Sequence, residues 1–253
     1  MNPAKPPTNE GGARGAFPTT HWSVVMSARS LDEAAARGAL EALCRQYWYP
    51  IYAFVRRQGR GHHEAEDLTQ ALFARLLDAD AFASPRPERG RFRTFLLGAT
   101  TNFLTDEWRR ALAQKRGGGT GHVPLPTTGA EQRFAAEPVD PGLTPEAAFD
   151  RAWALNMIER ALGELRLEYE ASGRGALYTA VARHVWSDAA PGSHAAAARE
   201  LGMSEHAFTV AVSRLRQRLR ERLRNEVLAT VARESDAADE LRHLMAALRT
   251  TSR

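Results

Sequence analysis

Residues 194–224 read HAAAARELGMSEHAFTVAVSRLRQRLRERLR, and this stretch defines the fold of the second half of the chain. A short alanine-rich helix is expected over residues 194–201, followed by a turn at Gly202. Ser204 suits the N-cap of a second helix, expected over residues 205–231. Apolar residues at steps of three and four predict its buried face: Phe208, Val212, Leu215, Leu219 and Leu223. Two helices joined by a glycine turn at this spacing are typical of a helix-turn-helix.

The opposite face of the second helix is polar and basic. A helix that enters the major groove of DNA needs hydrogen-bond donors and acceptors on its outward face, and neighbouring arginines suit contacts with phosphates. The residues expected to contact DNA are His206, Thr209, Ser213, Arg214, Gln217 and Arg218. Further arginines for the phosphates are Arg216, Arg220, Arg222 and Arg224. The alternative is an ordinary amphipathic helix whose arginine-rich face is only solvated.

Helical periodicity extends through most of the chain. The other helices expected from it cover residues 31–57, 64–78, 91–114, 144–166 and 176–186. Pro50 should kink or divide the first of these helices, and Thr144 followed by Pro145 is a typical helix start. Strand-like alternation is not found, so the sequence predicts an all-α protein.

Glycine and proline divide the chain into two small helical domains. The segment after residue 116 begins GGGTG and contains several prolines, which predicts a flexible linker. The expected organisation is a disordered N-terminus (1–16), a first domain (17–116), the linker (117–143), a second domain (144–231) and a C-terminal helical extension (232–253). The extension carries an apolar stripe that could pack on the second domain or bind a regulator: Leu241, Leu244, Met245 and Leu248.

Composition excludes several classes of protein. The chain has 253 residues, 43% of them hydrophobic, which is enough apolar material for a core. Its one cysteine, Cys44, excludes a disulfide framework and is expected to be a buried structural thiol. No apolar run approaches the roughly 18 residues that span a membrane. We therefore expect a cytoplasmic protein without a membrane partner. No nucleophile–base set and no nucleotide fingerprint is found, so neither an enzyme nor a cofactor is expected.

Positive charge gathers in two places. The formal net charge is +4, whereas residues 86–116 carry 8 basic and 3 acidic residues and residues 204–224 carry 6 and 2. The two segments thus hold +5 and +4, and the rest of the chain holds −5. Two basic segments on an acidic protein suit two nucleic-acid contacts, or else two solvated helix faces.

The first basic segment also carries aromatic residues. Cations that follow a backbone, together with rings that accept unstacked bases, can hold single-stranded nucleic acid. The phenylalanines Phe92, Phe95 and Phe103 recur at helical spacing and are better interpreted as core. Trp108 lies off that stripe, and its role stays open.

An acidic helix face is expected on the helix that begins near residue 64. It carries Glu66, Asp67 and Gln70, and it is either solvated or docks on a protein. With His62 and His63 beside it, the segment resembles a metal cluster. Because no second set of ligands follows at a recognisable spacing, no metal site is predicted.

Taken together, the motifs resemble the extracytoplasmic-function (group IV) class of the bacterial sigma-70 family, the small promoter-recognition subunits of RNA polymerase. The residues that carry the resemblance are AEDLTQ (65–70), RGRFRTFL (89–96), NFL (102–104), EWRR (107–110), AARELGMSE (197–205) and SRLR (213–216). The segments FPTTHWS (17–23) and ELRHL (240–244) look like the opening and close of one subgroup.

The resemblance implies a role for each predicted face. It assigns Glu66, Asp67 and Gln70 to the clamp of the largest core-polymerase subunit, and the helix-turn-helix to the minus-thirty-five element and the polymerase flap. The loop over residues 80–90 and the next helix would hold the melted minus-ten element. The residues implied for that DNA are Arg91, Arg93, Asn102, Arg109, Arg110 and Lys115.

Some features depart from that family or leave alternatives open. Thr209 and Ala211 are uncharged where many members carry a basic residue, and Gly98 stands where arginine is common. The sequence leaves open whether activity is controlled by an anti-sigma protein, by the extension or by a Ser/Thr kinase. Thr69 is the candidate phosphorylation site, although Glu66 and Asp67 already give the docking face its negative charge. The alternative functions are a helix-turn-helix regulator that binds duplex operators alone and a helical interaction protein without DNA binding.

Overall fold

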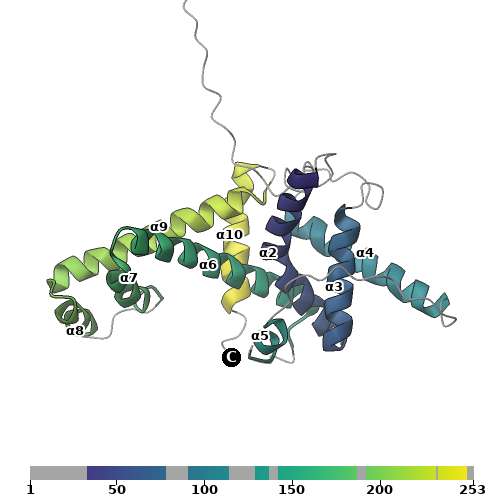
Figure 1. Cartoon of the computed structure of the whole chain (residues 1–253), viewed down its shortest axis with the longest axis horizontal. Helices are drawn as coiled ribbons and strands as arrows, with labels where there is room; N and C mark the ends of the chain where they lie inside the picture. The colour runs from purple at the N-terminus through teal and green to yellow at the C-terminus, as the bar shows by residue number, and fades with distance from the viewer. Residues whose placement is uncertain are drawn as a thin grey trace, which may run out of the picture.

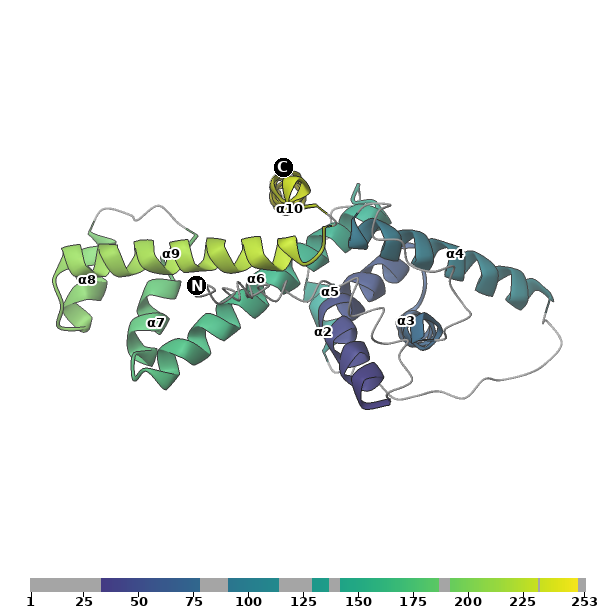
Figure 2. The same cartoon turned by 90° about the horizontal axis from the view of Figure 1, so that it is seen from above.

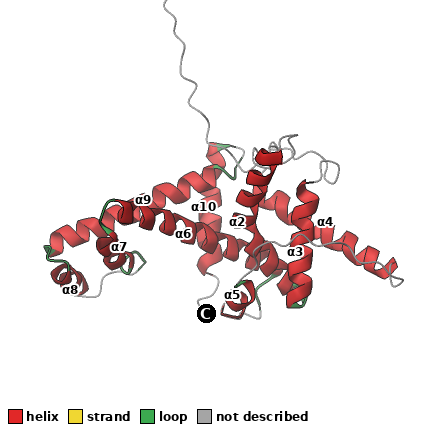
Figure 3. Cartoon of the chain, viewed as in Figure 1, coloured by secondary structure: helices red, strands yellow, loops and turns green. Residues whose placement is uncertain are grey.

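The computed structural model describes residues 33–77, 91–113, 129–136, 142–186, 192–231 and 233–249. Every regular element in these ranges is helical, so the all-α prediction is confirmed for them (Figure 3). None of these helices is both long and apolar enough to cross a membrane.

The observed helices follow the predicted ones closely at most ends. They are α2 (Glu33–Arg57), α3 (His62–Leu77), α4 (Phe92–Ala113), α5 (Ala130–Ala136), α6 (Pro145–Ala171), α7 (Gly175–Ala182), α8 (Ser193–Glu200), α9 (Glu205–Leu228), the 3₁₀ turn η2 (Glu234–Asp236) and α10 (Ala237–Arg249). Helix α6 continues beyond its predicted end at residue 166, and α7 ends before residue 186. The predicted cap of α6 is confirmed, because the Thr144 hydroxyl accepts a hydrogen bond of 3.2 Å from the Ala147 N–H.

A first apolar cluster joins both halves of the chain. Helices α2, α3 and α4 contribute to it, and so does the N-terminal half of α6. The ring of Tyr47, which is fully buried, lies 5.2 Å from Phe92 and 6.2 Å from Trp153 between ring centroids. Apolar residues on either side of the predicted linker thus share one core.

Helix α2 continues through Pro50 instead of being divided there. Proline has no N–H to donate to the carbonyl four residues earlier, here that of Gln46. The side chain of Asn156 on α6 donates to this carbonyl at 3.1 Å, and both residues are buried. The neighbouring helix therefore satisfies the acceptor that the proline leaves open, and Gly59, with φ of 85°, lies just beyond the end of α2.

Helix α5 lies inside the segment predicted as a flexible linker. It packs beside α2 (Figure 1), where the Glu131 carboxylate accepts hydrogen bonds from Tyr52 at 2.5 Å and from Arg56 at 3.0 Å. The Arg56 guanidinium also lies over the ring of Phe134, 4.8 Å from its centroid. Residues 130–136 are thus docked on the first cluster, which the glycine- and proline-rich composition around them did not predict.

A second apolar cluster holds α7, α8 and α9 against the C-terminal half of α6. Phe208, Val212, Leu215 and Leu219 are all buried in it, which confirms the apolar face predicted for α9. Leu223 is half-buried and packs against both clusters. The domain boundaries themselves stay a prediction, since α6 contributes to both cores.

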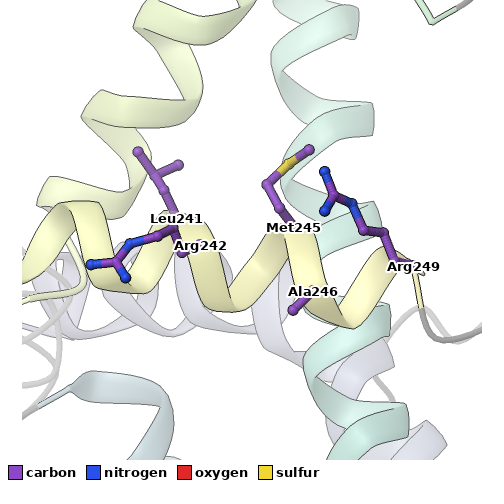
Figure 4. Close-up of a pocket in the computed structure, with 5 residues that line it drawn as sticks. All are labelled: Leu241, Arg242, Met245, Ala246 and Arg249. Carbon is purple, nitrogen blue, oxygen red and sulfur yellow. The ribbon is translucent and has the colours of Figure 1, made fainter.

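Helices α6 and α9 contact one another and both extend from the first cluster, but they diverge toward the second cluster, where α7 lies between them (Figure 2). Helix α10 packs against both helices at the first cluster (Figures 1 and 2). Ala237 and Leu244 of α10 are buried in that cluster. The extension therefore packs on α6 and α9, which lie in the predicted second domain as one of the two expectations had it, and also on the first core. A pocket on α10 is lined by Leu241, Arg242, Met245, Ala246 and Arg249, of which Met245 is an exposed apolar residue (Figure 4).

Candidate functional site

The acidic face predicted on α3 lies at the surface. Asp67 is exposed, whereas Glu66 and Gln70 are half-buried. The Glu66 carboxylate faces the His62 ring, with Oε2 3.6 Å from Nε2. A helix face with two carboxylates and an amide offers acceptors to a basic protein surface, and charge complementarity of this kind raises specificity and association rate.

Thr69 is not on this surface. Its side chain is fully buried, and its hydroxyl donates to the Ala65 carbonyl at 2.7 Å, one turn earlier. A kinase cannot reach a hydroxyl in this position unless α3 opens. The structure therefore removes Thr69 as an accessible phosphorylation site.

His62 is held by residues from two other helices. Its Nδ1 lies 2.9 Å from the Tyr52 hydroxyl, which also donates to Glu131. Burial, and then the Glu131 carboxylate, raise the pKa of Tyr52. One potential ligand atom from each of His62, His63 and Glu66 lies within 4.8 Å of the others. Three such atoms are one fewer than the four ligands of a closed structural zinc site.

On α4, the residues predicted to follow minus-ten DNA divide into two groups. Asn102, in the middle of the helix, and Arg109 and Arg110, near its C-terminal end, are exposed. The Arg110 guanidinium forms an ion pair with Glu107 at 2.6 Å, one turn away on the same helix. Lys115 lies outside the described residues.

Arg91 and Arg93, at the start of α4, are engaged by the C-terminal extension. The Glu240 carboxylate on α10 is fully buried, with Oε1 2.6 Å from Arg93 Nε and Oε2 3.1 Å from Arg91 Nη1. Arg93 is itself buried and also binds Asp150 of α6, at 3.0 Å. The Arg93 guanidinium is thus enclosed between two carboxylates, so the expectation that it contacts DNA is wrong for this conformation.

The same network ties three helices together. Asp150 accepts from Arg93 on one carboxylate oxygen, and its other oxygen lies 2.6 Å from His243 Nε2 on α10. A backbone hydrogen bond also joins the start of α4 to the segment just after α9, because the Phe92 N–H donates to the Thr230 carbonyl at 3.0 Å. Breaking one partner of a buried ion pair costs about 3–5 kcal/mol. The network therefore fixes α4, α6 and α10 relative to one another.

The outward face predicted for α9 is largely available. His206, Thr209, Ser213, Arg214 and Gln217 are exposed. The Ser204 hydroxyl accepts from the Ala207 N–H at 3.2 Å, and Gly202 in the preceding turn has φ of 65°, so the predicted turn and cap are confirmed. Thr209 bonds to His194 of α8 at 3.0 Å, which orients one part of this face.

Several arginines of α9 bind within the protein. Arg216 donates to the carbonyls of Val185 at 3.0 Å and His184 at 2.8 Å, beyond the end of α7. Arg218 and Arg222 both pair with Glu168 of α6. In this arrangement Arg216 is a structural residue, and Arg218 is neutralised by a carboxylate.

Sequence reasoning missed Asp150, Glu240 and Asn156, which have central roles in the packing. A buried carboxylate or amide has no distinctive spacing, and its partners lie up to 147 positions away. The available signal was the presence of polar or charged residues at positions that helical periodicity turns toward the core.

Comparison with known families adds one match. Residues 43–113 match the model of Sigma-70 region 2, and they span most of α2 together with α3 and α4. Sigma-70 region 2 is a non-enzymatic domain of transcription initiation factors. No curated protein and no solved structure matches the chain. Residues 43–113 are thus similar to Sigma-70 region 2, and this similarity supports a sigma factor of the sigma-70 family.

Proposed function

We propose that this chain is a sigma factor of the extracytoplasmic-function class that directs core RNA polymerase to promoters in the bacterial cytoplasm. The observation that carries the proposal is the match of residues 43–113 to Sigma-70 region 2. The matched segment contains both the acidic surface of α3 and the exposed C-terminal half of α4.

In this proposal α3 binds the polymerase. Glu66, Asp67 and Gln70 form the face that docks on the clamp of the largest subunit. Its exposed or half-exposed acidic groups support this role, because a basic partner would be attracted to them.

DNA contacts are proposed on two helices. Asn102, Arg109, Arg110 and Lys115 would follow the melted minus-ten strand, and the outward face of α9 would read the minus-thirty-five element. Arg91 is half-exposed and paired with Glu240, so it would reach DNA only after that ion pair opens. Regions 17–116 and 144–231 are the proposed polymerase-binding and helix-turn-helix units, with residues 117–143 between them.

The test is binding of purified core RNA polymerase to wild-type protein and to the double variant Glu66→Lys, Asp67→Lys. The matched control is Glu234→Lys with Asp239→Lys, which changes the net charge equally at exposed positions near and on α10. We expect tight binding by the wild type and the control, and loss of binding by the α3 variant.

The outcomes separate the function from the site. Binding that survives reversal on α3 would keep the sigma-factor function but overturn the docking face. A folded wild-type protein that binds no core polymerase, yet binds duplex DNA alone, would replace the proposal with a helix-turn-helix operator-binding regulator.

A further inference from the structure

Helix α10 places a carboxylate at the start of α4. The helix rests on the first cluster through Ala237 and Leu244, and Glu240 lies between them in the sequence. The Glu240 carboxylate faces two arginines, with Oε1 2.6 Å from Arg93 Nε and Oε2 3.1 Å from Arg91 Nη1. The C-terminal extension therefore neutralises both guanidinium groups at the start of α4.

The buried Glu240 and its arginines depend on one another. Glu240 has no exposed surface, and a buried charge that loses its partner is strongly destabilised. Glu240 can therefore stay in place only while the arginines neutralise it. Release of α10 leaves Arg93 with its second carboxylate, that of Asp150 at 3.0 Å, whereas no other carboxylate of the described residues forms an ion pair with Arg91. The group that α10 controls most directly is thus Arg91.

Arg91 is also the accessible member of this network. Its side chain is 30% exposed, compared with 9% for Arg93. Glu240 Oε2 accepts no hydrogen bond from the described residues, so the ion pair with Arg91 is its contact. A phosphate that bound Arg91 from solvent would place a second anion beside this carboxylate at the edge of a buried site, where repulsion is poorly screened. A phosphate and Glu240 therefore cannot share Arg91 without a cost.

We infer that α10 is an autoinhibitory latch, in which Glu240 competes with a phosphate of promoter DNA for Arg91. The inference rests on the proposed sigma-factor function and adds a means of control to it. When α10 is docked, Arg91 is neutralised and the promoter is bound weakly; when α10 is released, Arg91 binds the phosphate. Because coupling between two sites is reciprocal, a change that weakens the docking of α10 strengthens DNA binding, and DNA binding releases α10 by the same factor.

The first measurement is hydrogen–deuterium exchange of the backbone amides of residues 237–249 in the full-length wild-type chain. It compares the free protein, its complex with core RNA polymerase, and that complex on a promoter taken from the transcripts that it starts. We expect α10 to be protected in the first two states and to exchange at least about tenfold faster on the promoter, because local opening raises exchange. This comparison does not depend on a substitution that could fail to fold.

The second measurement is the affinity of variant complexes for this promoter at one fixed salt concentration, because phosphate contacts weaken with salt. Leu244→Ala removes a buried anchor of α10 but keeps Glu240 and Arg91. It should bind the promoter about 5- to 150-fold more tightly, the usual range of coupling between two sites. Adding Arg91→Gln to this variant should abolish the gain. Two controls should not gain affinity: Met245→Ala, at an exposed position of α10, and Leu43→Ala, at a buried position of the first cluster on α2.

Several results would overturn the inference. Protection of α10 that persists on the promoter, or an unchanged affinity of Leu244→Ala, would show that DNA and α10 do not compete. Protection lost already on core polymerase would make the polymerase, and not DNA, the competitor. An equal gain in Leu43→Ala would reflect a general loosening of the first cluster. If the wild-type protein binds no core polymerase, the proposed function fails as well, and this is distinguishable because it is seen before any exchange or variant experiment.

Discussion

The contact between Asn156 and the carbonyl that Pro50 leaves open makes a quantitative prediction. Asn156→Ala removes two hydrogen bonds, the 3.1 Å bond to the Gln46 carbonyl and the 2.7 Å bond from Arg133. A buried acceptor without a partner costs about 1–3 kcal/mol. Arg133 retains Glu159 at 3.4 Å and is partly exposed, so its loss is smaller. We expect the free energy of unfolding to fall by about 2–4 kcal/mol in all.

The second half of the test is a double-mutant cycle with Pro50→Ala. An alanine at position 50 restores the N–H that can donate to Gln46 within α2, so the loss of Asn156 should then cost less. The expected coupling energy is about 1 kcal/mol or more. Any cavity left by Pro50→Ala cancels in the cycle, because it is present in both variants that carry the change.

Urea unfolding followed by far-ultraviolet circular dichroism measures all four free energies, and Asn102→Ala on the exposed face of α4 is the control. The control should lie within about 0.5 kcal/mol of the wild type. Equal costs of Asn156→Ala in the two backgrounds would refute the reasoning, because the carbonyl would then not depend on the proline.

Three further predictions follow from other buried or shielded groups. Glu240→Gln removes the carboxylate of Arg91 and one of the two that enclose Arg93, and it should lower the free energy of unfolding by about 3–5 kcal/mol. Glu234→Gln, in an exposed pair, should cost less than about 1 kcal/mol. Equal costs in urea unfolding would contradict the role of the network. Burial, and then the nearby Glu41 carboxylate, raise the pKa of the Cys44 thiol to about 12. At pH 8 a thiol-specific disulfide reagent should therefore react with the native protein at least about a hundredfold more slowly than with the unfolded chain. Similar rates would show that the thiol is accessible. Burial, and then His194, lower the pKa of His184 below its ordinary 6.5. As the pH falls, His184 therefore takes up its proton in the unfolded chain before it does so in the folded protein. The free energy of unfolding should fall as the pH falls through 6.5 and level off below the folded pKa. His184→Gln should flatten this dependence in unfolding measured between pH 7.5 and 5.5, and an unchanged profile would exclude His184 as its source.

The helices were predictable because each buries one apolar face, and a 3.6-residue period is visible in the sequence without any knowledge of the partner. Phe208, Val212 and Leu215 on α9 illustrate this, since all three are buried as their spacing predicts. The caps at Thr144 and Ser204 were equally predictable, because capping involves atoms only three residues apart.

Exposure of a predicted binding residue was less predictable. Arg93 and Arg109 look alike in the sequence, as arginines in one basic segment on one helix. The structure encloses Arg93 between Glu240 and Asp150, whereas Arg109 stays exposed. Charge counts alone cannot distinguish a solvent-exposed arginine from one that pairs with a carboxylate more than a hundred residues further along the chain.

The sequence by itself determined the helix class, the apolar faces and the family resemblance, because these depend on residues close together along the chain. Only the tertiary structure decided that α5 docks on α2, that Asn156 completes the hydrogen bonding around Pro50, and that α10 closes over Arg91 and Arg93. Each of these contacts joins positions 75 or more residues apart. Their energy depends on burial and on distances of about 3 Å, which no local pattern specifies.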